Sequence, residues 1–214
     1  EQIVTGYSLS LYKSVRISRI SARRFAFGGN PTDCVMMALT EYMLDKRPGL
    51  ALSGVNRGQN LGDDVTYSGT VAGSMEATLL GIPAIAMSQQ VSGDKVQFQT
   101  AETLAPSIIT KLYKEKWPAD VFMNVNFPDV PAKAVSGVFI VPEGRRKSGY
   151  NSHEMQDPRR QDQSYITGNA IEGQYIGRKD TDYKAIERGE ISIMPLYYDL
   201  THRGALRSLR KSFG

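Results

Sequence analysis

Residues 50–88, LALSGVNRGQNLGDDVTYSGTVAGSMEATLLGIPAIAMS, hold two short apolar segments separated by a polar loop and a helical pattern. The apolar segments at 50–55 and 83–88 each have the length and composition of a buried strand. Ser68 favours the start of a helix, and Gly81 favours its end. A strand, a helix and a second strand in this order predict a parallel pairing of the two strands.

The same alternation continues on both sides of this stretch. Upstream, an apolar strand at 25–27 precedes a helix that begins at Asn30 and ends before Pro48. This helix is expected to turn four side chains inward: Val35, Ala38, Leu39 and Tyr42. Downstream, an amphipathic helix at 101–116 precedes a strand at 121–127. The sequence therefore predicts an α/β fold whose mostly parallel sheet is covered by helices on both faces, with ligands bound at the carboxyl ends of the strands.

The second half of the chain has a different character. From Gly137 it is strand-like, and residues 144–163 are basic, polar and rich in turn residues. The further elements expected are strands at 174–176 and 191–194 and a basic helix at 203–212. We expect this half to form an extended hairpin region that is used for assembly.

The composition is that of an ordinary globular chain, with 41% apolar and 22% charged residues among 214. No run approaches the ~18 apolar residues of a membrane helix, so no membrane partner is expected. Residues 1–5 lack the features of a signal peptide, and because the first residue, Glu1, is not Met we expect a processed chain or a piece of a longer product. Cys34 is the one cysteine, which excludes an internal disulfide and a cysteine-based zinc site and favours a reducing cytoplasm.

The net charge of +4 is unevenly distributed. Basic residues gather at 145–160 and again at 203–211. A solvated or oligomer-facing surface is the favoured explanation, and attraction of phosphorylated ligands is the weaker one, because charge alone is not specific.

The loop at 53–64 has the densest polar composition in the chain and follows a predicted strand directly. Its three glycines allow sharp turns and close approach of the backbone to a ligand. Asn56 and Asn60 offer neutral amide groups, and Asp63 and Asp64 offer hard carboxylate oxygens, a mixture that suits Mg²⁺ or Mn²⁺ with phosphate better than zinc. On local chemistry alone, a plain glycine and asparagine turn explains the segment equally well.

A second polar group opens the helix that follows this loop. Free N–H groups at a helix start bind phosphate, and the hydroxyls of Ser68 and Thr70 add donors beside Gly69. Taken alone, Ser68 is better explained as an ordinary N-cap. Because the two groups are close in sequence, they can line one pocket.

Several familiar sites are absent from the sequence. There is no P-loop, no dinucleotide-binding glycine pattern and no nucleophile elbow. His153 and His202 lie outside both polar groups, so neither a histidine-based triad nor a histidine-rich metal site is expected.

The stretch 53–87 resembles the SurE family, whose signature Ser-Gly-Val-Asn-x-Gly-x-Asn-x-Gly-x-Asp, Tyr-Ser-Gly-Thr-Val-Ala-Gly and Gly-Ile-Pro-Ala-Ile-Ala-x-Ser it follows in order and spacing. Four shorter segments are also similar to landmarks of that family: 5–9, 31–35, 124–128 and 192–196. The resemblance implies a Rossmann-like α/β domain over 1–135, lacking its first strand and helix. It further implies an extended hairpin and C-terminal helix over 136–214 that mediate oligomerisation as dimers or tetramers.

The resemblance also implies an activity, namely hydrolysis of nucleoside 5'- and 3'-monophosphates, and of polyphosphate in some members, with one divalent metal ion, Mg²⁺ or Mn²⁺. Asn56 matches the metal-binding asparagine of the family, and Asn60 matches its second active-site asparagine. Ser68, Gly69 and Thr70 match its phosphate-contacting Ser-Gly-Thr. We therefore expect Asn60 and Ser68 to take part in catalysis.

The chain departs from the family pattern at the remaining metal ligands. Family members carry an Asn-Asp-Asp-Gly segment whose two aspartates no residue here matches, so the resemblance places these two ligands upstream of Glu1. Asp63 and Asp64 match a different family position. Ile3 stands where the family has a metal-binding serine, and an isoleucine cannot be a ligand.

These departures leave two alternatives to a phosphatase. A nucleotide-binding or scaffold protein that has lost catalysis fits Ile3 and the unmatched aspartates. A nucleic-acid-binding oligomer fits the basic segments, but those segments lack the interleaved aromatic residues of a single-strand groove, so nucleic acid is the least favoured partner.

Overall fold

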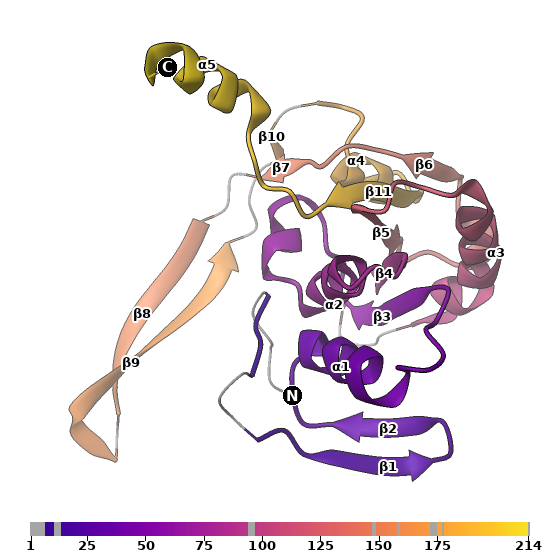
Figure 1. Cartoon of the computed structure of the whole chain (residues 1–214). Coiled ribbons are helices and arrows are strands. Elements are labelled where there is room, and N and C mark those ends of the chain that lie inside the picture. Colours follow the sequence, from indigo (N-terminus) through magenta and orange to yellow (C-terminus); the bar gives the residue numbers. More distant parts are fainter. Residues whose placement is uncertain are drawn as a thin grey trace.

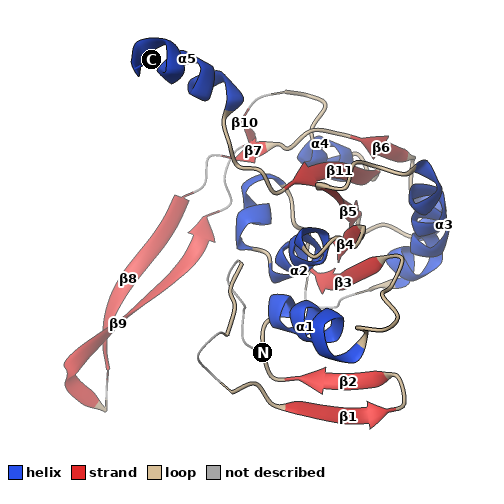
Figure 2. Cartoon of the chain, viewed as in Figure 1, coloured by secondary structure: helices blue, strands red, loops and turns tan. Residues whose placement is uncertain are grey.

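The protein is described by a computed structural model that covers residues 7–10, 14–93, 97–146, 149–157, 159–171, 175–176 and 178–213. Figures 1 and 2 show a central sheet with helices packed around it, from which one long hairpin and the C-terminal helix project. Glu1, Ile3 and residues 5–6 of the segment at 5–9 lie outside the described residues. The replacement of a ligand at Ile3 and the expectation of ligands upstream of Glu1 therefore stay predictions.

The central sheet has five strands in the order β3 (Ala51–Arg57), β4 (Ala84–Gln89), β5 (Val121–Phe127), β11 (Ile191–Tyr197) and β6 (Val138–Ile140). The β3–β4, β4–β5 and β11–β6 pairs are parallel, and only β11 against β5 is antiparallel within this sheet. The prediction of an α/β fold with a mostly parallel sheet is therefore confirmed. Because β6 and β11 both follow residue 136 and lie in the sheet, strands from both predicted domains build it, and the boundary at 135 stays a prediction.

Helices cover both faces of the sheet because side chains alternate along the strands. On one face, Ile85 and Met87 of β4 pack with α3 (Gln99–Glu115). On the other face, Ala84 and Ala86 pack with the second layer of helices. That layer consists of α1 (Pro31–Met37), its π-helical continuation η1 (Ala38–Tyr42) and α2 (Gly69–Leu79).

The predicted helix ends are confirmed, and each has a local cause. The Asn30 N–H donates to Asp33 Oδ2 over 2.8 Å at the start of α1. Ser68 Oγ accepts from the Val71 N–H over 3.1 Å at the start of α2. After α2, Gly81 adopts φ +80°, a conformation that favours glycine and ends the helix before β4.

The environment of the strand at 25–27 differs from the expectation. It forms β2 (Arg24–Phe27), which pairs with β1 (Ile17–Ser21) in a separate antiparallel hairpin and does not join the central sheet. Tyr42 was expected to point inward, but it is 48% exposed, and its ring packs against that of Phe25 on this hairpin with the ring centroids 4.8 Å apart. The prediction that Tyr42 is a core residue is therefore wrong.

The longest strands among the described residues lie in the second half of the chain. β8 (Gly149–Asp157) and β9 (Arg160–Ile171) form an antiparallel hairpin, which we call the arm, and it extends away from the sheet (Figure 1). At its base, β7 (Arg145–Arg146) pairs with β10 (Tyr175–Ile176).

The remaining elements are short, apart from the C-terminal helix. They are η2 (Gly62–Tyr67), η3 (Ala132–Ala134), α4 (Asp182–Glu187) and α5 (Arg203–Phe213). None of residues 203–213 is buried, and α5 stands apart from the helices that cover the sheet (Figure 2). Among the described residues, no helix combines the length and the apolar character that crossing a membrane requires.

Candidate functional site

The polar loop follows the carboxyl end of β3, as predicted, and an irregularity in β3 shapes its start. The register between β3 and β4 shifts between Ser53 and Asn56, so that Asn56 comes opposite Ser88. Gly54 occupies the shift at φ +131°, where a Cβ would lie 2.3 Å from the carbonyl oxygen of Met87. No side chain fits there, which explains why glycine stands at this position.

The amide nitrogen of Asn56 is held by its own loop. Its Nδ2 donates to the carbonyl oxygens of Gly58, over 2.9 Å, and Arg57, over 3.3 Å. Because the nitrogen is committed to its own loop, Oδ1 is the atom left for a ligand. A neutral amide oxygen of this kind fits one position around Mg²⁺ or Mn²⁺.

Asn60 is buried and fixes the loop on the sheet. Its Nδ2 donates to Ser88 Oγ over 2.6 Å, and its N–H donates to Asn126 Oδ1 over 2.8 Å. Its carbonyl oxygen accepts from Asn124 Nδ2, over 2.8 Å, and Asn126 Nδ2, over 3.1 Å. The loop is thus held by β4 and β5, and a direct contact between Asn60 and a phosphate stays a prediction.

Asn124 and Asn126 were not singled out as site residues by the sequence. The signal was present, since two asparagines at alternate positions of the apolar strand VFMNVNF must lie on one face. Within the described part of the chain, Asn124 Oδ1 and Ser192 Oγ are buried and have no hydrogen-bond partner.

Ser68, Gly69 and Thr70 form the start of α2, the helix that packs over β3 and β4. Ser68 is buried and acts as the N-cap, which confirms the simpler interpretation of this residue. The N–H groups of the first helical turn have no acceptor within the helix, so those of Gly69 and Thr70 remain suited to an anion. Phosphate binding there stays a prediction.

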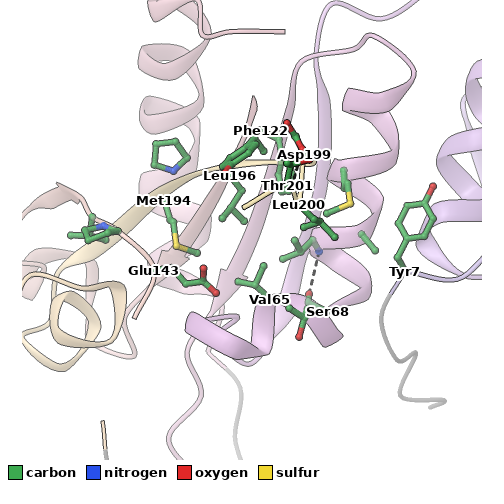
Figure 3. Close-up of a pocket in the computed structure, with 18 of the residues that line it drawn as sticks. Tyr7, Val65, Ser68, Phe122, Glu143, Met194, Leu196, Asp199, Leu200 and Thr201 are labelled. Carbon is green, nitrogen blue, oxygen red and sulfur yellow. Dashed lines mark hydrogen bonds between the residues drawn. The ribbon is translucent and has the colours of Figure 1, made fainter. Parts of the chain in front are cut away.

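A pocket of about 740 Å³ lies beside α2, over Phe122 and Met194. Figure 3 shows Val65 and Ser68 between Glu143 on the left and Tyr7 on the right. Apolar side chains dominate the lining. The pKa of Glu143 in this lining is raised, mainly because the side chain is partly buried and to a smaller extent because the negative charges of Asp182 and Asp63 lie near it.

Tyr7 lies against α2. Its hydroxyl donates to the buried Glu76. The pKa of Tyr7 is raised to about 12, mainly because the hydroxyl is partly buried and in second place because it is bonded to the Glu76 carboxylate. The phenol therefore stays protonated at neutral pH and cannot serve there as a general base.

Carboxylates do not gather into a metal centre in the part of the chain that the structure describes. No group of three or more His, Cys, Asp or Glu side chains converges there. Asp63 and Asp64 lie in the first turn of η2, and His202 is exposed. The candidate ligand that the described residues offer in the polar loop is the amide oxygen of Asn56. The charged ligands that the family resemblance implies stay a prediction.

Comparisons with known proteins show which family the chain resembles. A family model described as "Survival protein SurE" matches residues 1–150. The "5'-nucleotidase SurE" of Paramagnetospirillum magneticum is 44% identical over 214 residues, covering all of this chain and 82% of that protein. The "5'-nucleotidase SurE" of Geobacter sulfurreducens is 40% identical over 98% of this chain and 79% of that protein. The crystal structure of the SurE protein from Aquifex aeolicus matches with a TM-score of 0.82 and 31% identity, over 98% of this chain and 84% of that chain.

Proposed function

Because the chain belongs to the SurE family, we propose that it is a metal-dependent phosphomonoesterase that hydrolyses nucleoside 5'-monophosphates. Hydrolysis of 3'-monophosphates and short polyphosphates belongs to the same proposal. The observation that carries it is the loop at 53–64, whose Asn56 presents an amide oxygen beside β4 while Asn60 anchors the loop to two strands.

The residues of the chain would divide the work between metal and phosphate. Asn56 Oδ1 would bind one divalent ion, Mg²⁺ or Mn²⁺. Such an ion, when bound, polarises a phosphoryl oxygen and lowers the pKa of a bound water. The N–H groups of Gly69 and Thr70, with the Thr70 hydroxyl, would hold phosphate oxygens as negative charge develops on them. The burial of Asn60 supports a role in holding this loop still, in addition to the catalytic contact that the family resemblance implies.

One observation favours a second candidate. Ile3 stands at the family position of a metal-binding serine, and an alkyl side chain offers no electron pair to a metal ion. A nucleotide-binding protein with weakened catalysis would carry such a change. The two candidates differ in whether nucleotide is consumed or only bound.

The test is phosphate release from 5'-AMP, 3'-AMP and tripolyphosphate with Mn²⁺, Mg²⁺ or EDTA, using the protein as its gene encodes it. We expect hydrolysis that requires the metal ion and that is lost in Asn56→Ala, with unchanged circular dichroism. The exposed Gln99→Ala at the start of α3 is the matched control and keeps full activity. Metal-dependent turnover by Asn56→Ala at the wild-type rate would refute the site, and binding of 5'-AMP without release of phosphate would establish the second candidate.

We also propose self-association as a dimer or tetramer through α5. Leu209 is 55% and Phe213 88% exposed on α5, and the apolar pocket beside α2 is wide enough to receive such side chains from a second copy. Leu209→Asp is expected to lower the mass measured by light scattering on a sizing column. Ser208→Asp, which places the same charge on another side of the helix, is expected to leave that mass unchanged. A monomeric wild type would refute the proposal.

A further inference from the structure

A buried carboxylate at the start of α4 holds the polar loop at the end opposite to Asn56. Asp182 is fully buried. Its Oδ2 accepts the Gly62 N–H over 2.7 Å, and its Oδ1 accepts the N–H groups of Gly144 and Tyr183, each over 2.8 Å. The three donors come from the end of the polar loop, from the segment that leads into the arm and from α4 itself.

The packing around these bonds leaves no room for adjustment. Gly62 has φ +48°, and a Cβ on it would lie 2.4 Å from the Tyr183 ring and 2.6 Å from the Gly144 carbonyl oxygen. A Cβ on Gly144 would lie 2.6 Å from the same ring. The Tyr183 hydroxyl also donates to the Leu61 carbonyl oxygen over 2.8 Å. Leu61 and Gly62 therefore cannot move unless Asp182 and Tyr183 move with them.

The bonding of Asp182 is directional, because every donor recorded for its carboxylate is a backbone N–H. Burying a carboxylate without hydrogen-bond donors would destabilise the fold. Because this carboxylate accepts hydrogen bonds from two separate chain segments, it fixes the distance between those segments. With Asn60 tied to β4 and β5, the loop is secured at two successive points, first at Asn60 and then at Gly62.

We propose that Asp182 is a positioning residue for the metal-binding loop. It sets the place of Gly62, and together with the bonds of Asn60 to β4 and β5 it orders the loop that follows Asn56. The inference rests on the proposed function for its metal-binding part. The part that concerns the order of the loop follows from the hydrogen bonds of Asp182 and Tyr183.

The first test is Asp182→Asn in the protein as its gene encodes it. An asparagine has nearly the same shape, but its NH₂ group cannot accept a hydrogen bond. In place of Oδ2 it loses the bond from Gly62, and in place of Oδ1 it loses the bonds from Gly144 and Tyr183. We expect the Mn²⁺ concentration that half-saturates 5'-AMP hydrolysis to rise about 10- to 100-fold, as is usual when a residue that orients a metal ligand is removed. A defect in overall stability alone would lower the rate in proportion to the unfolded fraction and leave that concentration unchanged.

The second test needs no activity. We expect amide hydrogen exchange of residues 56–62 in the metal-free protein to accelerate at least tenfold in Asp182→Asn, while exchange in α3 keeps its wild-type rate. Tyr183→Phe, which removes the hydroxyl bond to Leu61, is expected to accelerate the same residues and serves if Asp182→Asn does not fold. The control is Asp180→Asn, whose carboxylate is exposed and pairs with Arg178.

The outcomes separate the two proposals. If wild-type protein does not hydrolyse nucleotides, the proposed function fails, and the exchange rates still decide whether Asp182 positions the loop. Unchanged exchange at 56–62 in both variants would overturn the inference. Acceleration spread equally over α3 would also overturn it, because Asp182 would then stabilise the whole fold and not the loop.

Discussion

Two alanine substitutions in one strand test how the polar loop is held. Asn124 and Asn126 are both fully buried in β5, and their side chains lie on the same face of the sheet. Asn126 accepts the Asn60 N–H and donates to the Asn60 carbonyl oxygen, whereas Asn124 only donates to that oxygen. Asn126→Ala therefore leaves the Asn60 N–H without a partner. Asn124→Ala leaves the Asn60 carbonyl oxygen with its bond to Asn126.

The magnitudes follow from these bonds. A buried donor left without an acceptor costs about 1–3 kcal/mol, and Asn126→Ala carries this term. Asn124→Ala also removes a buried Oδ1 that has no hydrogen-bond partner among the described residues. Removing this unpaired atom offsets part of the stability that the substitution costs. Both substitutions delete the same atoms from equally buried sites, so the loss of packing is similar. We expect Asn126→Ala to lower the free energy of unfolding by roughly 2 kcal/mol more than Asn124→Ala.

Urea unfolding followed by the fluorescence of Trp117, the single tryptophan, measures this difference. Trp117 is half-buried against the core between the sheet and α3, so its emission reports on the fold. With a urea dependence of about 2 kcal/mol per M, the two midpoints should differ by roughly 1 M. Equal midpoints, or a lower midpoint for Asn124→Ala, would refute the assignment of Asn126 as the main anchor of the loop.

Two further predictions concern stability. Gly54→Ala should unfold the protein or lower its free energy of unfolding by about 3 kcal/mol or more, because the new Cβ meets the Met87 carbonyl oxygen. Gly58→Ala, at φ +100° in open space, should lower the free energy of unfolding by about 1 kcal/mol. Comparable losses in thermal unfolding for the two variants would contradict the steric argument. The second concerns pH. Burial raises the pKa of Asp33, but the N–H groups of Ser10 and Asn30 and the Ser10 hydroxyl together outweigh it and hold the net pKa below its ordinary value. The stability from this ionised carboxylate is present above the unfolded pKa of about 4 and is lost as pH falls through the lower folded value. The melting temperature of Asp33→Asn, recorded from pH 6 to pH 3, should fall less steeply than that of the wild type, and parallel curves would contradict this account.

The sequence predicted the elements whose ends have local causes. Ser68 and Gly81 delimit α2 by capping and by a positive φ, and both effects act within a few residues. The partner of β2 was not predictable in the same way, because Phe25 and Phe27 indicate a strand without indicating which strand pairs with it. The short α4 was missed, although Thr181 and Gly189 stand where an N-cap and a helix end are favoured.

The sequence predicted where the candidate site lies, but it predicted the roles of the site residues only in part. Polar side chains in a glycine-rich loop look alike in sequence, whether they face a ligand or the sheet. The structure separates them: Asn56 directs its amide nitrogen into the loop and leaves its oxygen for a ligand, while Asn60 is buried against Ser88. Asp182 lies more than a hundred residues from Gly62 in sequence, and no local pattern connects the two.

The meeting of Gly144 with Asp182 also affects how the chain can vary. The segment that contains the arm begins after Gly144 and ends before Asp182, and these two residues are joined by a hydrogen bond of 2.8 Å. A segment whose two ends already touch behaves as an insertion, because lengthening it adds little to the entropy of closing the loop. We expect the arm to tolerate deletions, added residues or a grafted peptide at its tip, with thermal unfolding of the sheet unchanged. The arm is therefore a natural place to attach a tag or a label.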